Sequence, residues 1–122
     1  MEPIARSLSL EAGISNRALR YVAMWILQTS ESEADSFTFQ LPPGAVKTVG
    51  RASRADFSVD AALVSRVHCR LTAREERVEG EDLASTNGTY VNDRRVDRAQ
   101  LASGDRLRVG RVELKVQKSR NA

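Results

Sequence analysis

The chain has 122 residues, of which 41% are hydrophobic and 29% are charged, and its formal net charge is +3. This length suits one domain with a buried core, and the composition is typical of a soluble globular protein. The longest apolar run, residues 21–27, is too short to cross a membrane and lacks the features of a signal peptide. We therefore expect a cytoplasmic protein that does not bind membranes, with only a weak preference for anionic partners.

The chain has one cysteine and one histidine, Cys69 and His68. One cysteine cannot form an internal disulfide, which fits a reducing compartment. These two adjacent residues cannot build a metal site by themselves, so we expect no metal and no cofactor. Cys69 lies in an alternating segment beside Leu71, which predicts a small buried apolar side chain.

In chain order, residues 1–20 show no clear period and predict an N-terminal arm, which we expect to be partly disordered. Residues 21–28 are rich in aromatic and β-branched side chains, and residues 37–41 alternate strictly, so both predict strands. Pro42, Pro43 and Gly44 end the second strand. Further short strands are expected at 46–49, 57–59, 69–73 and around Val78.

The last third of the chain alternates most clearly. Asn92-Asp93 predicts a hairpin turn, and so does Gly110-Arg111, between apolar alternating segments. We predict an all-β chain, an antiparallel β-sandwich of ten to eleven short strands, over residues 21–117. Residues 118–122 are expected to be a polar tail.

Three polar loops interrupt these strands: Gly50-Arg51, residues 65–68 and residues 85–88. Because loops of a sandwich cluster at its two ends, these loops can meet. Arg51 and Arg66 would then supply guanidinium groups, and Ser65 and Thr86 would supply hydroxyl donors. The side-chain amide of Asn87 can pair with a peptide backbone. These groups together suit a phosphate, which has about two negative charges and three strong acceptor oxygens.

Eight short segments and two single positions of the chain carry a family resemblance, by identity and order. They are Val49-Gly50-Arg51, Asp56-Phe57, Val59-Asp60, Val64-Ser65-Arg66-Val67-His68, Asp82-Leu83, Ser85-Thr86-Asn87-Gly88-Thr89, Val91-Asn92, Gly104-Asp105, and the apolar positions Leu101 and Leu114. In order and spacing they resemble the forkhead-associated (FHA) domain, a module that binds phosphothreonine, from about Trp25 to Val116. The chain departs from the pattern at Asp93, where the family often has glycine.

The resemblance implies a role for each site residue. Arg51, Ser65, Arg66 and Thr86 would contact the phosphate, and Asn87 would hold the peptide backbone beside the phosphothreonine. His68, Gly50 and Gly88 would support the site structurally. The apolar loop at residues 61–64 would favour an aliphatic residue about three positions after the phosphothreonine. The expected partner is a protein or peptide that a Ser/Thr kinase has phosphorylated on threonine, and the chain would act as an adaptor.

Three other functions compete with this one. An FHA fold can bind a partner independently of phosphorylation. The arginines favour nucleic acid, but the acidic segment at residues 75–82 and the few aromatic residues argue against it. Ser65 and His68 could form a nucleophile and a base, yet the sequence shows no third group to orient the histidine. We therefore expect no enzyme activity and no nucleic-acid partner.

Overall fold

The computed structural model describes residues 22–30 and 36–121. These residues form eleven β-strands and no helix. The strands are β1 (Val22–Thr29), β2 (Thr38–Leu41), β3 (Val46–Gly50), β4 (Phe57–Ser58), β5 (Cys69–Ala73), β6 (Val78–Asp82), β7 (Thr89–Val91), β8 (Arg94–Val96), β9 (Arg98–Leu101), β10 (Arg106–Val109) and β11 (Val112–Asn121). The described part of the chain accordingly has no helix that is long and apolar enough to cross a membrane.

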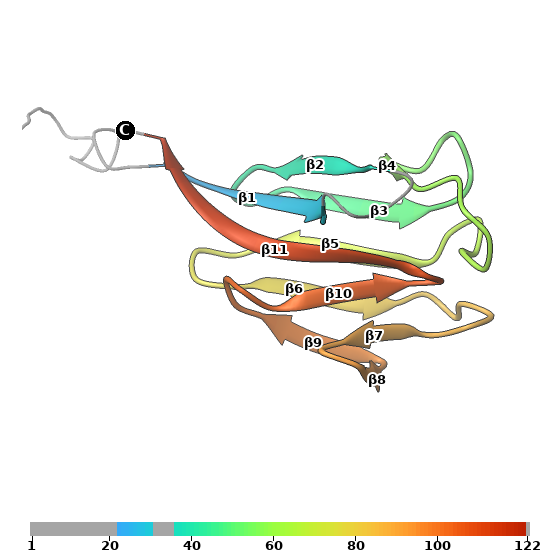
Figure 1. Ribbon diagram of the computed structural model, residues 1–122. Helices are drawn as coiled ribbons and strands as arrows, with labels where there is room; N and C mark the ends of the chain where they lie inside the picture. The colour runs from blue at the N-terminus through green and yellow to red at the C-terminus, as the bar shows by residue number, and fades with distance from the viewer. Residues whose placement is uncertain (1–21, 31–35, 122) are drawn as a thin grey trace, which may run out of the picture.

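The strands form two sheets that lie face to face (Figure 1). One sheet has six strands in the order β2-β1-β11-β10-β7-β8, and the other has five in the order β4-β3-β5-β6-β9. Neighbouring strands are antiparallel except β3 and β4, which pair in parallel. The predicted β-sandwich is therefore confirmed, with one parallel pair that the sequence pattern did not indicate.

The core lies between the inner faces of the two sheets. In a strand of a sandwich, successive side chains point to opposite faces, so every second one can point inward. In β5, for example, Cys69, Leu71 and Ala73 are buried while Arg70 is exposed. Trp25 is fully buried, and its indole N–H donates a hydrogen bond to the carbonyl oxygen of Arg74 at 3.1 Å. Fully burying an aliphatic side chain such as Leu27 or Leu71 contributes about 1.5–3 kcal/mol.

The backbone φ values agree with the two predicted hairpin turns. Asn92 and Asp93 have φ values of 50° and 70°, as a type I′ hairpin between β7 and β8 requires. Gly110 has a φ of 59° between the paired residues Val109 and Val112 of the β10–β11 hairpin. Cys69 is unpaired and buried as predicted, and burial raises the pKa of its thiol to about 12.

Two features differ from the sequence prediction. Strand β9 was not predicted, because its Arg98-Ala99-Gln100-Leu101 sequence carries little β propensity; it forms by pairing with β6. Strand β11 continues to Asn121, so residues 118–121 are not a tail. Their pairing with β1, such as Lys118 with Trp25, supplies the backbone partners that the polar sequence did not reveal. The expected N-terminal arm lies outside the described residues.

Candidate functional site

The three polar loops of the sequence meet at one end of the sandwich, on the right in Figure 1. They connect β3 to β4, β4 to β5 and β6 to β7. The backbone N–H of Arg51 donates to the carbonyl oxygen of Ser65 at 2.8 Å, which joins the first loop to the second. The backbone N–H of Thr86 donates to the hydroxyl oxygen of Ser65 at 3.0 Å, which joins the third loop to the second. Ser65 therefore lies at the junction of all three loops.

Gly50 allows the first two loops to lie this close together. A Cβ atom at position 50 would lie 2.1 Å from the carbonyl oxygen of Arg66 and 3.0 Å from the Cα of Val67. Both contacts are with backbone atoms, which cannot move aside as a flexible side chain can. Glycine is therefore required here by close approach of two backbones.

His68 is fully buried beneath the loops. Its Nδ1 accepts a hydrogen bond from the backbone N–H of Ser65 at 3.0 Å, and its Nε2 lies 2.9 Å from the carbonyl oxygen of Gly88. Because a carbonyl oxygen can only accept, the proton must be on Nε2, and the imidazole is neutral. His68 thus holds the second and third loops at a fixed separation.

A second polar cluster, which sequence reasoning did not assign, shapes the third loop. The carboxylate of Asp82 accepts hydrogen bonds from the hydroxyls of Ser85 at 2.5 Å and Thr89 at 2.6 Å, and from the backbone N–H of Ser85 at 3.1 Å. Burial raises the pKa of Asp82, but these hydrogen bonds outweigh burial and the pKa is lowered below its ordinary 3.8. The sequence signal was the Asp-x-x-Ser spacing, which is typical of side-chain-stabilised turns.

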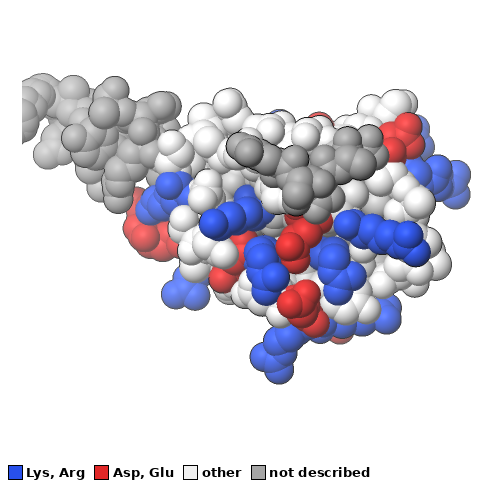
Figure 2. All heavy atoms as spheres, in the orientation of Figure 1, with Lys and Arg blue, Asp and Glu red and all other residues white. Residues whose placement is uncertain are grey.

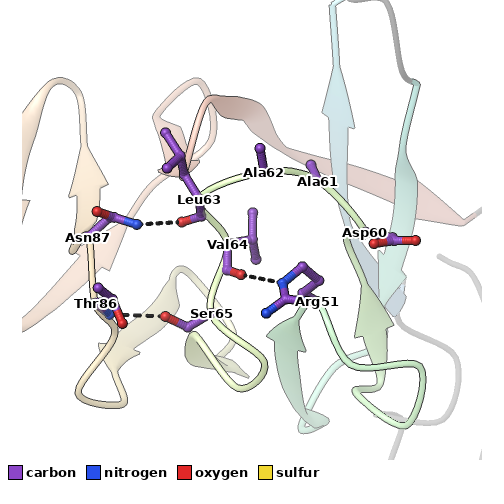
Figure 3. A pocket seen from close by; sticks show the side chains of 9 residues that line it. All are labelled: Arg51, Asp60, Ala61, Ala62, Leu63, Val64, Ser65, Thr86 and Asn87. Carbon is purple, nitrogen blue, oxygen red and sulfur yellow. Dashed lines mark hydrogen bonds between the residues drawn. The ribbon is translucent and has the colours of Figure 1, made fainter.

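The loops line an open pocket of about 490 Å³ on the outside of this end of the sandwich (Figure 3). Its lining residues are Arg51, Asp60, Ala61, Ala62, Leu63, Val64, Ser65, Thr86 and Asn87. The Nε of Arg51 donates to the carbonyl oxygen of Val64 at 2.9 Å, which orients the guanidinium. Arg51 has no ion-pair partner in residues 22–30 and 36–121, so its charge is not neutralised by the described protein.

The structure brings together most, but not all, of the predicted contact residues. Arg51, Ser65, Thr86 and Asn87 line one pocket, and Nδ2 of Asn87 donates to the carbonyl oxygen of Leu63 at 3.0 Å. Arg66 is exposed and does not line this pocket. The role of Arg66 in phosphate binding therefore stays a prediction.

Chemically, the pocket combines an oriented guanidinium, two hydroxyl groups and a side-chain amide. Guanidinium groups and hydroxyls bind phosphate oxygens through charge-assisted hydrogen bonds. Within the described ranges, no group of three or more His, Cys, Asp or Glu side chains is arranged to hold a metal ion. The oriented guanidinium of Arg51 and the two hydroxyl groups make the pocket suited to an anion.

A family model for the FHA domain matches residues 47–110, which include all three loops. The chain belongs to the FHA domain family. The match covers β3 from Lys47 onward, strands β4 to β10 and the pocket, and the six-stranded sheet is completed by β1, β2 and β11 outside it.

Similar proteins include FHA-containing proteins of mycobacteria. The ABC transporter ATP-binding/permease protein Rv1747 of Mycobacterium tuberculosis is 43% identical over 77 residues, which are 63% of this chain and 9% of that protein. The glycogen accumulation regulator GarA of the same species is 37% identical over 70 residues, 57% of this chain and 43% of that one. The chain thus matches less than half the length of these relatives.

Among solved structures, the chain is similar to an FHA domain described for its phosphothreonine-dependent interactions. That domain is 33% identical, with a TM-score of 0.66, and the alignment covers 79% of this chain and 95% of the other. The alignment therefore covers nearly the whole solved domain, and it covers more of this chain than the family match does.

Proposed function

We propose that this FHA domain binds a phosphothreonine peptide non-covalently and acts as an adaptor downstream of a Ser/Thr kinase. The observation that carries the proposal is the pocket in which Arg51, Ser65 and Thr86 lie together, with no acidic partner for Arg51 in the described residues. The similar solved domain that is described as phosphothreonine-dependent supports it.

Each side chain has a distinct task in this proposal. The guanidinium of Arg51 binds phosphate oxygens with the two terminal nitrogens, since its Nε is already bonded to Val64. The hydroxyls of Ser65 and Thr86 donate to the same phosphate, and Arg66 adds charge from the exposed edge. Asn87 retains its amide oxygen and one amide hydrogen for the peptide backbone, because Nδ2 donates only one hydrogen bond, to Leu63.

Leu63 supports the expected preference for an aliphatic ligand residue near the phosphothreonine. Its side chain is 47% exposed, and its φ of 71° is rare for a residue with a branched side chain. Asn87 holds the carbonyl of Leu63, so the conformation that exposes the leucine is coupled to the residue that would bind the peptide backbone. Figure 3 shows the Leu63 side chain directed away from the loop, between Asn87 and Ala62.

Catalysis by Ser65 and His68 is disfavoured by their hydrogen bonds. His68 binds the backbone N–H of Ser65 rather than its hydroxyl, and its other ring nitrogen faces Gly88. The imidazole therefore cannot remove a proton from the serine hydroxyl without breaking the loop. We propose that the domain is not an enzyme.

Nucleic-acid binding is disfavoured by the distribution of charge. Figure 2 shows Asp and Glu side chains interspersed with Lys and Arg on the face of the molecule in view. Arg106 pairs with both Asp93 and Glu113, and on the other sheet Arg98 pairs with Glu79 and Glu81. Cations neutralised in this way do not form the continuous basic surface that binds a phosphate backbone.

A cytoplasmic location is part of the proposal, because the unpaired Cys69 suits a reducing compartment.

The test is capture of peptides from three degenerate libraries that are identical except for a central phosphothreonine, phosphoserine or threonine. We expect selective retention of the phosphothreonine library. Retention of all three libraries would indicate phosphorylation-independent binding, and retention of none by the folded protein would refute the proposal.

A further inference from the structure

Asp60 lines the pocket together with the predicted phosphate-binding residues but is not part of their cluster. Figure 3 shows it at the opposite end of the pocket from Asn87, with Arg51 between them. Its side chain is exposed and makes no hydrogen bond or ion pair within residues 22–30 and 36–121. A carboxylate in a pocket built for an anion is unexpected, since it repels the ligand that the other side chains attract.

The carboxylates that shape this end of the fold are engaged differently. Asp56, only four residues earlier, accepts hydrogen bonds from the backbone N–H and the hydroxyl of Thr48. Asp82 is bonded to Ser85 and Thr89. Both have a structural task within the protein, whereas Asp60 has no hydrogen-bond or ion-pair partner in the described part of the chain, so its charge is available to a ligand.

The charge balance of the bound state indicates what that ligand carries. A phosphate at neutral pH brings about two negative charges, which Arg51 and Arg66 would neutralise. The carboxylate of Asp60 then stays without compensation at the pocket wall. A positive charge on the ligand would compensate it, and a negative one would be repelled.

The wall beside Asp60 suits a long side chain with a charged end. Ala61 and Ala62 follow Asp60 along the pocket and present only methyl groups. Lysine and arginine side chains lay their methylene groups on such apolar surface while the charged head reaches a polar partner. This wall therefore accommodates an aliphatic stem that ends at the carboxylate.

We propose that Asp60 is a specificity-determining residue, which selects peptides with a lysine or arginine within a few residues of the phosphothreonine, on the side opposite to the residue held by Asn87. The inference rests on the proposed phosphothreonine binding. It extends that specificity to the charge of a residue that flanks the phosphothreonine. It defines a ligand with two charged groups of opposite sign.

The experiment is a positional scan of phosphothreonine peptides in which each flanking position carries lysine, norleucine or glutamate in turn. The wild-type protein should bind the lysine peptide about three- to tenfold more tightly than the glutamate peptide at one or two positions, as expected for a solvent-exposed ion pair. The preference should shrink when salt is raised from about 0.05 M to 0.5 M.

Two variants assign the preference to Asp60. Asp60→Asn should abolish it, and Asp60→Lys should invert it towards glutamate, while both variants still bind the norleucine peptide. Glu75→Gln is the matched control, because Glu75 is an exposed carboxylate in the β5–β6 turn, outside the pocket. It should leave the lysine preference unchanged.

Three results would overturn the inference. The wild type could show no charge preference at any position, or the preference could persist in Asp60→Asn. Asp60→Asn could also weaken all peptides equally, which would make Asp60 a positioning residue for Arg51. Failure of every phosphothreonine peptide to bind is a different result, because it would refute the proposed function itself.

Discussion

His68 and Gly88 are joined by a hydrogen bond of 2.9 Å between the imidazole Nε2 and the glycine carbonyl oxygen. On the other side of the ring, Nδ1 accepts the backbone N–H of Ser65 at 3.0 Å. One neutral side chain thus connects the loop that bears Ser65 with the loop that bears Thr86 and Asn87. The separation of these two loops, and with it the width of the pocket, depends on this ring.

His68→Ala should therefore lower both stability and peptide binding. The substitution leaves a cavity, a partly buried N–H at Ser65 and a buried carbonyl at Gly88 without their partner, so we expect a loss of roughly 2–5 kcal/mol in the free energy of unfolding. Chemical denaturation measures it. The neighbouring Val67→Ala, at a side chain that is 46% exposed, is the control and should change stability by about 0.5 kcal/mol or less. Equal stability of the two variants would contradict the bracing role.

Gly50→Ala should be more destabilising than an alanine at an unobstructed glycine. The new Cβ would lie 2.1 Å from the carbonyl oxygen of Arg66, so the β4–β5 loop must move, at an expected loss of about 3 kcal/mol or more. Gly104→Ala is the control, because nothing lies within 4 Å of its added Cβ and only its φ of 101° is unfavourable, a loss of about 1–2 kcal/mol. Thermal or chemical unfolding of the pair compares them directly, and an equal loss in both would argue against the close approach.

Arg51→Ala should remove binding while the fold survives. Charge-assisted hydrogen bonds to a phosphate contribute roughly 1.5–3 kcal/mol each, so loss of two of them weakens binding about a hundredfold or more. The variant loses only one partly buried hydrogen bond, to the carbonyl of Val64, and should lose about 1 kcal/mol of stability. Calorimetry with a phosphothreonine peptide tests the first expectation and denaturation tests the second.

Arg54→Ala is the matched control for Arg51→Ala. Arg54 is also exposed and lies in the same β3–β4 connection, but it does not line the pocket. Its loss should leave affinity within about twofold of the wild type. A variant Arg51→Ala that unfolds, or that binds as well as Arg54→Ala, would undercut the assignment of the site.

The lowered pKa of Asp82 makes the stability of the fold sensitive to acid. Burial opposes its ionisation, but hydrogen bonds from Ser85 and Thr89 outweigh burial and lower its pKa below 3.8. A carboxyl group whose pKa is lower in the folded than in the unfolded state stabilises the fold at neutral pH. That contribution declines as the pH falls below the unfolded value towards the folded one. The free energy of unfolding should therefore decrease when the pH is lowered below about 4.

Asp82→Asn provides the test, because it removes the titrating group. The variant should be less stable than the wild type at pH 7, and the difference should narrow as the pH is lowered below about 4. Denaturation curves recorded across this range measure the difference. A constant difference between the two proteins would show that Asp82 does not contribute through its ionisation.

Much of the fold was predictable because it depends on local sequence. Strict alternation located β2 and β5, and the paired turn residues Asn92 and Asp93 located the β7–β8 hairpin. The burial of Cys69 followed from the same period. In these segments the side-chain pattern and the backbone geometry agree, so few tertiary contacts are needed to infer them.

The exceptions depend on partners that are distant in sequence. The extension of β11 to Asn121 comes from pairing with β1, more than ninety positions earlier at its far end, where Val22 pairs with Asn121. The network of Asp82 with Ser85 and Thr89 was visible only as a spacing. The family resemblance assigns a phosphate contact to Arg66, which follows Ser65 in the chain, yet Arg66 does not line the pocket.

Local sequence was enough to predict the β-sandwich class, most strands and turns, and the residue types of an anion site, because alternation and turn chemistry act over a few residues. The packed fold was needed to show that one pocket is lined by Arg51, Ser65, Thr86 and Asn87, and by Asp60 as well. These contacts could not be predicted locally because they join loops, such as Thr86 to Ser65 across 21 positions. Their geometry is set by the packing of two sheets and by the buried ring of His68, not by neighbouring residues in the chain.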